Sequence, residues 1–198
     1  MHVVTVRVCG SPISCLMYNL TGDTLVAGSQ NGSMYLFRSS KDGFVYTRYG
    51  RMSGFQPISC IDWSESGQYL QTVTSDNDLA YWNLRNLTFI KNHVEVREEI
   101  WLTQTCPLSY LVHGIWCASR GTTIHITVDK NENRGLLAAG DTEGYIRLYR
   151  YPVLSPKAGW HEYKVYTSYL SCARFSPEED LLYTTGGTDA AFMRWKLE

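Results

Sequence analysis

A tetrapeptide that occurs twice restricts most strongly what this chain can fold into. Pro12-Ile13-Ser14-Cys15 returns 45 residues later as Pro57-Ile58-Ser59-Cys60. The same offset aligns a glycine, a leucine, a turn residue and an aromatic residue: Gly22 with Gly67, Leu25 with Leu70, Asn31 with Asp76, and Phe37 with Trp82. An internal period of about 40 to 45 residues is typical of the four-stranded blades of β-propellers.

Two further copies of the unit follow. The stretch "AGSQNGSMYLF" aligns with "AGDTEGYIRLY", which places Gly28 over Gly140 and Gly32 over Gly144. The last copy places Cys172 over Cys15 and, after a one-residue insertion, Trp195 over Phe37. We therefore predict four blades at about 10–50, 55–92, 110–152 and 160–198, with an inserted segment at about 93–117.

Each copy has the pattern of antiparallel strands. Apolar and polar residues alternate in short runs, and turn residues separate the runs, so the fold class expected is all-β. The pair Asn31-Gly32 predicts a hairpin with a type I′ turn, in which both residues have positive φ. Weaker patterns predict outer strands within 43–50, 87–92 and 161–167, and one more strand at the N-terminus, within 2–8.

Composition limits the classes of partner. Apolar residues make up 44% of the chain, and no run approaches the roughly 18 apolar residues of a membrane span. The N-terminus lacks the features of a secretory signal, so we expect a soluble cytosolic protein and no membrane partner. The net charge is -1 with both signs interspersed, which argues against an overall attraction to nucleic acid.

The repeated cysteines have three interpretations: a metal site, a disulfide, or one structural position in several copies. Cys15, Cys60 and Cys172 fall in different blades at equivalent positions, and no C-x-x-C spacing occurs. This favours reduced cysteines packed between sheets, where a small apolar side chain fits. Cys9, Cys106 and Cys117 show no consistent spacing.

The motifs of common enzymes are not found in the sequence. It contains no G-x-S-x-G elbow, no phosphate-binding loop and no H-E-x-x-H motif. The glycines of "GLLAAGDTEG" suit a hairpin rather than a dinucleotide site, and His125 alternates with Ile124 and Ile126 as on an ordinary strand. We predict no catalytic, cofactor-binding or metal-binding residues, no cofactor, and no enzymatic activity.

Some aromatic and basic residues are not explained by the repeat. Phe37, Trp82, Tyr149 and Trp195 recur at one position and are expected in the blade cores. Aromatic residues dominate many protein interfaces, so those expected on outer strands or loops form a candidate contact patch: Tyr46, Tyr49, Phe55, Trp160, Tyr163, Tyr166 and Tyr169. A candidate basic group for an acidic partner surface comprises Arg147, Arg150, Lys157 and Lys164.

Several patterns in order carry a resemblance to a known family. They are "SGFQPISCIDWSESGQYL" at 53–70, "WLTQTC" at 101–106, "VHGIW" at 112–116, "LLAAGDTEGYIRLYRYP" at 136–152 and "TGGTDAAFMRWKL" at 185–197. Together they resemble the C-terminal propeller of the echinoderm microtubule-associated protein-like (EMAP-like) family of WD-repeat proteins. The resemblance covers roughly residues 24 to 198 and matches the last four blades of the family's second propeller.

The resemblance implies a non-enzymatic, cytoplasmic protein of the cytoskeleton that binds tubulin or microtubules through joined propellers. In the family, an N-terminal coiled coil and a basic region contribute to attachment. An alternative is a scaffold or adaptor for signalling or ubiquitin-system complexes, since propellers carry unrelated functions.

The chain departs from the family in the hydrogen-bonded network that commonly locks WD-repeat blades. That network joins a Gly-His pair, a turn Asp, a Ser or Thr, and a Trp. Here Gly54-Phe55 replaces Gly-His before the second unit, and "YKVYTSYLS" stands before the fourth. Asp141 is retained, but Thr142 and Glu143 replace the residues expected after it. We therefore expect incomplete networks.

Four blades are fewer than a closed WD-repeat ring generally contains. WD-repeat rings generally close with about seven blades, so four should form an open arc with two uncovered apolar faces. We expect two copies to associate, the ring to tighten, or further blades of a longer protein to close it. The predicted strand at Val3–Val8 is expected to swap onto a neighbour or to complete the final blade.

Overall fold

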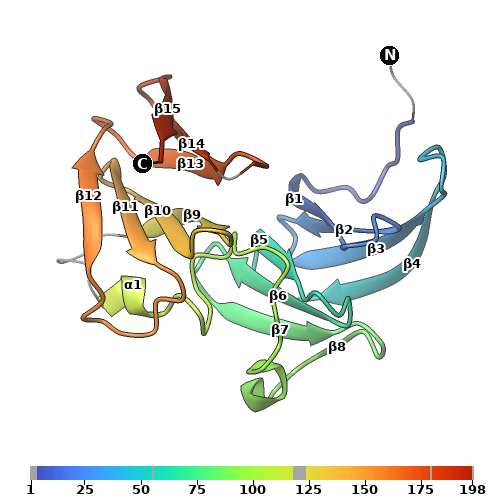
Figure 1. Ribbon diagram of the computed structural model, residues 1–198. Coiled ribbons are helices and arrows are strands. Elements are labelled where there is room, and N and C mark those ends of the chain that lie inside the picture. Colours follow the sequence, from blue (N-terminus) through green and yellow to red (C-terminus); the bar gives the residue numbers. More distant parts are fainter. Residues whose placement is uncertain (1–3, 55, 118–123, 179, 198) are drawn as a thin grey trace. The chain divides into compact units, whose positions relative to one another are not determined.

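The computed structural model describes residues 4–54, 56–117, 124–178 and 180–197, except for the side chains of Cys117 and His125. Nearly all of its regular structure is β (Figure 1). The first sheet contains β1 (Ile13–Tyr18), β2 (Thr24–Ser29), β3 (Ser33–Ser39) and β4 (Tyr46–Ser53). The second contains β5 (Ile58–Trp63), β6 (Tyr69–Thr74), β7 (Leu79–Asn83) and β8 (Thr88–Phe89). The third contains β9 (His125–Asn131), β10 (Leu136–Asp141), β11 (Tyr145–Arg150) and β12 (Trp160–Lys164), and the fourth β13 (Leu170–Phe175), β14 (Leu181–Gly186) and β15 (Phe192–Lys196).

Within each sheet, strands that follow one another in sequence pair antiparallel. This is the hairpin topology expected of propeller blades, and we call the sheets blades 1 to 4. The chain divides into unit 1, residues 1–106, with blades 1 and 2, and unit 2, residues 107–198, with blades 3 and 4.

The first strands of blades 1, 2 and 4 share a β-bulge at the repeated serine. Cys15 pairs with Gly28, Cys60 with Val73, and Cys172 with Thr185, and in each strand the register shifts just before the cysteine. The extra residue that a bulge inserts is therefore the serine of the repeat. The hydroxyl of Ser14 donates to the carbonyl of Gly28 at 3.2 Å, and that of Ser171 to Thr185 at 3.0 Å. The predicted equivalence of the three cysteines is confirmed.

The hairpin turns between the second and third strands confirm the hairpins but not the predicted turn type. The loop in blade 1 contains three residues, 30–32, and only Gly32 has positive φ, at 77°. Asn31 keeps negative φ because its side-chain oxygen accepts the backbone N–H of Ser33 at 2.9 Å, so the type I′ prediction was wrong. The equivalent left-handed residues in blades 2 to 4 are Asn77, Gly144 and Ala190.

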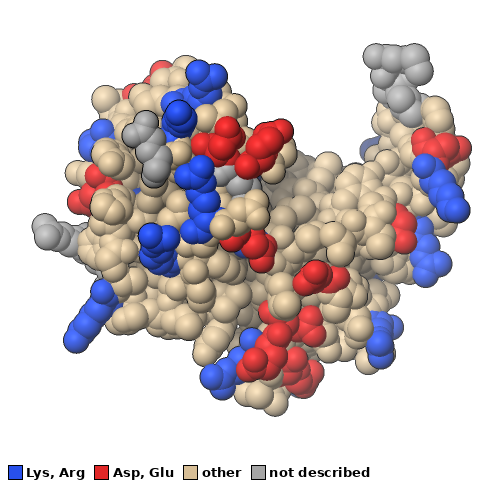
Figure 2. All heavy atoms as spheres, in the orientation of Figure 1, with Lys and Arg blue, Asp and Glu red and all other residues tan. Residues whose placement is uncertain are grey.

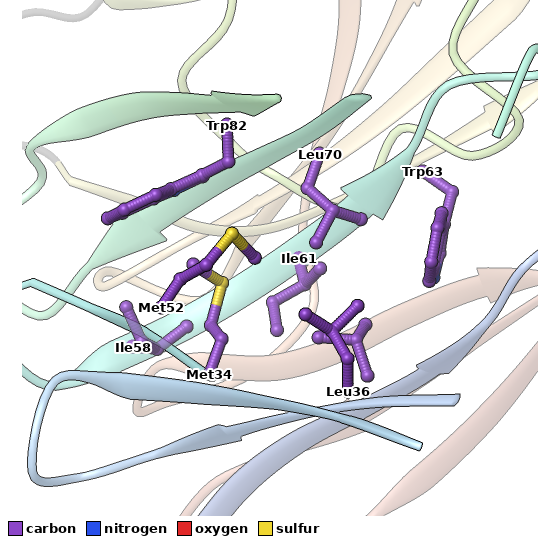
Figure 3. Packing of buried hydrophobic residues seen from close by; sticks show 9 residues of the cluster. Met34, Leu36, Met52, Ile58, Ile61, Trp63, Leu70 and Trp82 are labelled. Carbon is purple, nitrogen blue, oxygen red and sulfur yellow. The ribbon is translucent and has the colours of Figure 1, made fainter. Parts of the chain in front are cut away.

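The core of unit 1 lies between blades 1 and 2. Met34, Leu36 and Met52 of blade 1 contact apolar side chains of blade 2, including Ile61 and Leu70 (Figure 3). The indole Nε1–H of Trp63 also donates to the carbonyl of Met17 at 3.2 Å, which joins the two first strands. At roughly 25 cal/mol per Å² of apolar surface removed from water, this burial is the main contribution to the stability of the unit.

The core of unit 2 is built in the same way. Ile146 of β11 packs against Leu170, Ala173 and Leu182 of blade 4. The backbone N–H of Phe175 donates to the carboxylate of Asp129 at 2.8 Å, which links the first strands of blades 3 and 4.

The repeated aromatic position is also confirmed. At the repeated position, the aromatic residue of the third strand pairs directly with a leucine of the second strand: Phe37 with Leu25, Trp82 with Leu70, Tyr149 with Leu137, and Trp195 with Leu182. Phe37, Trp82 and Tyr149 are buried, and Trp195 is half-buried.

Strand pairing differs from the sequence division at two places. Residues 160–164 form β12 and pair with β11, so they belong to the third sheet rather than to a fourth unit at 160–198. The third sheet begins at His125, whereas residues 110–117 hold turns and α1 (Gly114–Cys117). The repeat did not reveal these limits because outer strands have little sequence in common.

The predicted N-terminal strand was wrong for the residues that are described. Residues 4–8 form no strand; Val8 packs against apolar residues of blade 1, and Val4 and Val6 line a hollow on that blade. The alternation of valines reflects this one-sided contact. Blade 4 has no fourth strand among the described residues.

Candidate interaction surfaces

The structure separates the candidate aromatic patch into different environments. Phe55 lies outside the described residues. Tyr46 and Tyr49 belong to β4 in unit 1, where the hydroxyls of Tyr46 and Tyr18 are hydrogen-bonded at 2.6 Å. In unit 2, Trp160, Tyr163 and Tyr169 are exposed.

Tyr166 is not a surface residue, and its burial corrects two expectations. It is 3% exposed, and its hydroxyl is hydrogen-bonded to Thr184 Oγ1 at 2.9 Å. The same Oγ1 accepts the indole N–H of Trp195 at 3.0 Å. Tyr166 thus occupies the place that a histidine takes in the usual WD-repeat network, and the network of blade 4 is closed by a different residue. A search of the sequence for the Gly-His pair does not find this network, because a tyrosine takes the place of the histidine.

The segment before blade 4 is fixed by a second set of hydrogen bonds. The carboxylate of Asp189 accepts the backbone N–H groups of Thr167 and Ser168, both at 3.1 Å, and both of their hydroxyls. The side-chain bond from Thr167 is the main reason why the pKa of Asp189 lies below its usual value. The loop that carries Tyr166 is therefore tied to the β14–β15 turn.

The candidate basic group is likewise divided. Arg147 is only 8% exposed, and its guanidinium binds Asp141 at 2.5 Å and Glu162 at 3.1 Å, so it is a structural residue of blade 3. Burial lowers the pKa of Arg147, but the negative charge of Asp141 and the hydrogen bond that Arg147 donates to Glu162 outweigh it and leave the pKa raised. Arg150, Lys157 and Lys164 are exposed.

The inserted segment is attached to blade 2 through a buried carboxylate. Asp62 is 0% exposed and accepts hydrogen bonds from Thr103, Thr105, Cys106 and Gln71, at 2.6 to 3.1 Å. The segment between β8 and β9 also includes η1 (His93–Val96) and a bridge from Trp101 to Ser64. Asp62 therefore explains how a stretch outside the repeat is held in place.

The described cysteine side chains fit the structural interpretation. Cys9, Cys15, Cys60, Cys106 and Cys172 are not in disulfides. Burial raises the pKa of Cys15 to about 11, and burial together with the charge of Asp62 raises that of Cys106. Both remain protonated at neutral pH and so are poor metal ligands or nucleophiles. Among the described side chains, no group of three or more His, Cys, Asp or Glu could hold a metal ion.

A groove of about 1210 Å³ lies in unit 2 between blade 3 and blade 4. Its apolar floor includes Ile146, Leu148, Leu182 and Trp195, and Tyr163 stands beside Trp195 with 6.0 Å between ring centroids. Three basic residues line it as well: Arg134, Arg150 and Lys196. In the view of Figure 2, basic side chains lie over the part of unit 2 that holds β11, β12 and β15.

Most of the residues that line this groove were not candidates from the sequence. Trp160, Tyr163 and Arg150 were candidates, but Arg134 and Lys196 were not.

Each unit also exposes apolar side chains on a terminal blade. Leu16 on β1 is 60% exposed, and the face around it holds a hollow of about 320 Å³ lined by Val4, Val6 and Ile13. On blade 4, Phe192 is 64% exposed and stacks on Tyr183 at 5.6 Å between ring centroids. No described helix has the length and apolar character that crossing a membrane requires.

Comparison with a solved structure supports the architecture. The β-propeller domain of Cps50 (Swd1) from Myceliophteria thermophila superimposes with a TM-score of 0.62 over 98% of this chain and 69% of that one. Sequence identity is 14%, so this likeness establishes the fold alone: the chain is built of β-propeller blades.

Sequence comparison gives the family. "Echinoderm microtubule-associated protein-like 4" of Xenopus laevis is 33% identical over 93% of this chain and 20% of its own length. The 77 kDa echinoderm microtubule-associated protein of Lytechinus variegatus is 33% identical over 92% of this chain and 28% of its own length. "Echinoderm microtubule-associated protein-like 1" of Homo sapiens is 32% identical over 98% of this chain and 24% of its own length.

The chain thus spans between a fifth and somewhat over a quarter of these relatives. The family model described as "Echinoderm microtubule-associated protein second beta-propeller" matches residues 1–197. With four antiparallel blades and a family match over nearly every residue, the chain belongs to the family of the second β-propeller of echinoderm microtubule-associated proteins.

Proposed function

We propose that this chain is a non-enzymatic protein-interaction module that contributes to binding tubulin or microtubules in the cytoplasm. The observation that carries the proposal is the family match over residues 1–197, together with relatives that are named as microtubule-associated. The described surfaces suit protein contacts, since exposed aromatic and basic side chains lie together in unit 2.

A co-sedimentation assay with stabilised microtubules tests this proposal. We expect the purified chain to pellet with microtubules at micromolar tubulin and to remain in the supernatant without them. Because tubulin binding by an exposed basic surface is electrostatic, Lys157→Glu should weaken retention severalfold and raising the salt should weaken it further. The matched control is Lys41→Glu, which makes the same charge change at an exposed site in unit 1.

Absence of retention at tens of micromolar tubulin would contradict the proposal and favour a scaffold or adaptor for signalling or ubiquitin-system complexes. Equal loss of retention in both lysine variants would show that the net charge of the chain, and not the surface of unit 2, determines retention.

We also propose that two copies associate through the exposed apolar faces of the terminal blades. Leu16 and Phe192 are far more exposed than core side chains at neighbouring strand positions, and contiguous apolar surface of this kind favours association. Sedimentation velocity should show a dimer at tens of micromolar. Leu16→Glu or Phe192→Glu should raise the dissociation constant about tenfold, because a charge would be placed in an apolar contact.

Val94→Glu is the matched control, since Val94 is at least as exposed but lies on η1 and belongs to neither terminal blade. A monomer at all concentrations, or equal effects of the three substitutions, would contradict association through these faces.

A further inference from the structure

One carboxylate at the surface of unit 2 joins two segments that are far apart in the sequence. Asp189, in the β14–β15 turn, accepts a backbone N–H and a hydroxyl hydrogen from each of Thr167 and Ser168, which lie between β12 and β13. The hydroxyl of Ser168 in turn accepts the backbone N–H of Thr188 at 3.2 Å. We call these four residues the Asp189 clasp.

The clasp lies beside two aromatic rings that pack on the same turn. The ring of Tyr166 lies against Gly186 and that of Tyr169 against Gly187, so closely that a Cβ at either glycine would clash. The backbone N–H of Gly187 also donates to the carbonyl of Tyr169 at 2.9 Å. The position of both rings therefore depends on the attachment of segment 165–169 to the β14–β15 turn.

The hydroxyl of Thr167 is both exposed and part of this attachment. It donates to Asp189, which is 22 positions away, so the bond joins two separate elements. An exposed hydroxyl such as that of Ser40 donates instead to Asp42, two positions away, and added charge there would disturb a single turn. The pKa of Asp189 is lowered, chiefly by the bond from Thr167, so its carboxylate is ionised at neutral pH.

We propose that Thr167 is a phosphorylation site and that its phosphate opens the Asp189 clasp. A protein kinase transfers the γ-phosphoryl group of a nucleoside triphosphate to Thr167 Oγ1. The new O–P bond forms, the bond from that phosphorus to the β-phosphate oxygen breaks, the nucleoside diphosphate leaves, and the hydroxyl proton passes to the catalytic base of the kinase. The inference goes beyond the proposed function, because its test uses no tubulin.

The phosphate acts through charge and through the loss of a donor. Phosphothreonine carries a charge of about −2 at neutral pH and, next to a carboxylate, disrupts by repulsion. The basic residues that flank the segment in sequence are engaged elsewhere: Lys164 donates to the carbonyl of Glu143, and Arg174 to that of Val128. The repulsion from Asp189 therefore decides the outcome, and segment 165–169 separates from the β14–β15 turn.

The closed clasp also determines when the kinase acts. While Thr167 donates to Asp189, its hydroxyl is not free to enter a kinase active site. The kinase therefore modifies the open state, and the phosphate prevents the clasp from closing again, which shifts the population towards the open state.

Hydrogen exchange on the full chain tests the effect of the phosphate. Phosphothreonine is incorporated at position 167 by amber suppression, and the amides of Ser168 and Thr188 should then exchange about tenfold faster or more, whereas those of β6 should not change. Thr167→Val removes the hydroxyl without adding charge and should have a smaller effect. Phosphoserine at Ser155 is the matched control, since it adds the same charge at another exposed site in unit 2.

A change of charge at position 189 tests the electrostatic mechanism. In Asp189→Lys the clasp lacks its acceptor, but a phosphate on Thr167 is attracted to the lysine, so phosphorylation should slow the exchange of Ser168 in this variant. In Asp189→Asn the phosphate should accelerate exchange less than it does in the original chain. Equal acceleration in all three proteins would contradict repulsion by Asp189.

The modification itself is tested with MgATP and a panel of purified serine/threonine kinases, and mass spectrometry locates the phosphate. We expect phosphate at Thr167, and a higher rate in Asp189→Asn because the hydroxyl is released more often. No phosphate at Thr167 in either protein, or unchanged exchange in the phosphorylated chain, would overturn the proposal. Thermal unfolding followed by circular dichroism verifies that each variant is folded.

Discussion

Replacing Asp62 with alanine is expected to lower the free energy of unfolding of unit 1 by about 4 kcal/mol or more. The carboxylate is buried, and its removal would leave donors of Thr103, Thr105 and Cys106 without acceptors in the interior. Each buried donor that loses its acceptor still carries the full free-energy cost of its removal from water, and the costs of the several donors add. The inserted segment at 101–106 should detach from blade 2.

Hydrogen exchange measures this effect locally, which avoids assuming that both units unfold together. The backbone amides of Thr105 and Cys106 should exchange much faster in Asp62→Ala, while those of β14 should exchange at the original rate. Asp62→Asn should have a smaller effect because one amide oxygen still accepts. Asp76→Ala, at an exposed turn, is the matched control. Unchanged protection of both amides would contradict the role of Asp62.

Replacing Thr184 with valine is expected to lower the stability of unit 2 by about 2 to 3 kcal/mol. Thr184 is buried, and its hydroxyl holds both Tyr166 and Trp195. Valine has almost the same shape, so the loss is due to the two hydrogen bonds and not to a cavity. Urea unfolding followed by tryptophan fluorescence measures the change.

Tyrosine-to-phenylalanine changes give the matched controls. Tyr166→Phe removes one of the two bonds and should cost about 1 kcal/mol. Tyr149 is also buried, but its hydroxyl has no hydrogen-bond partner in the described part of the chain, and burial raises its pKa to about 12. Tyr149→Phe should therefore be neutral or slightly stabilising. A larger loss for Tyr149→Phe than for Tyr166→Phe would contradict this account of the network.

Sequence predicted those parts of the fold in which the local backbone conformation or burial at a position requires a particular type of residue. Gly32 marks a backbone position with positive φ, and the leucine–aromatic pairs mark strand positions that must be buried. The leucine–aromatic pairs recur in each copy and the glycine in two of them, so the repeat revealed four blades and the equivalence of Cys15, Cys60 and Cys172. Family membership followed from several motifs in the right order.

The features that sequence did not predict depend on partners that lie on other strands. Arg147 appeared to be a surface cation, but Asp141 and Glu162 pair with it across adjacent strands. Tyr166 appeared to be a loop aromatic, but Thr184 lies opposite its hydroxyl. The groove depends on two blades, since Leu148 and Tyr163 of blade 3 and Trp195 of blade 4 line it together.

The serine bulge has a consequence for how blades can be recombined. A bulge shifts the side chains that follow it to the opposite face of the sheet. Because Ser14, Ser59 and Ser171 each introduce that shift at the same point, the first strands of blades 1, 2 and 4 alternate their side chains between the two faces of the sheet in the same order. A chimera in which one of these first strands replaces another, with the junction at the cysteine, would keep each side chain on its original face. A junction that omits the serine would move the side chains to the opposite face.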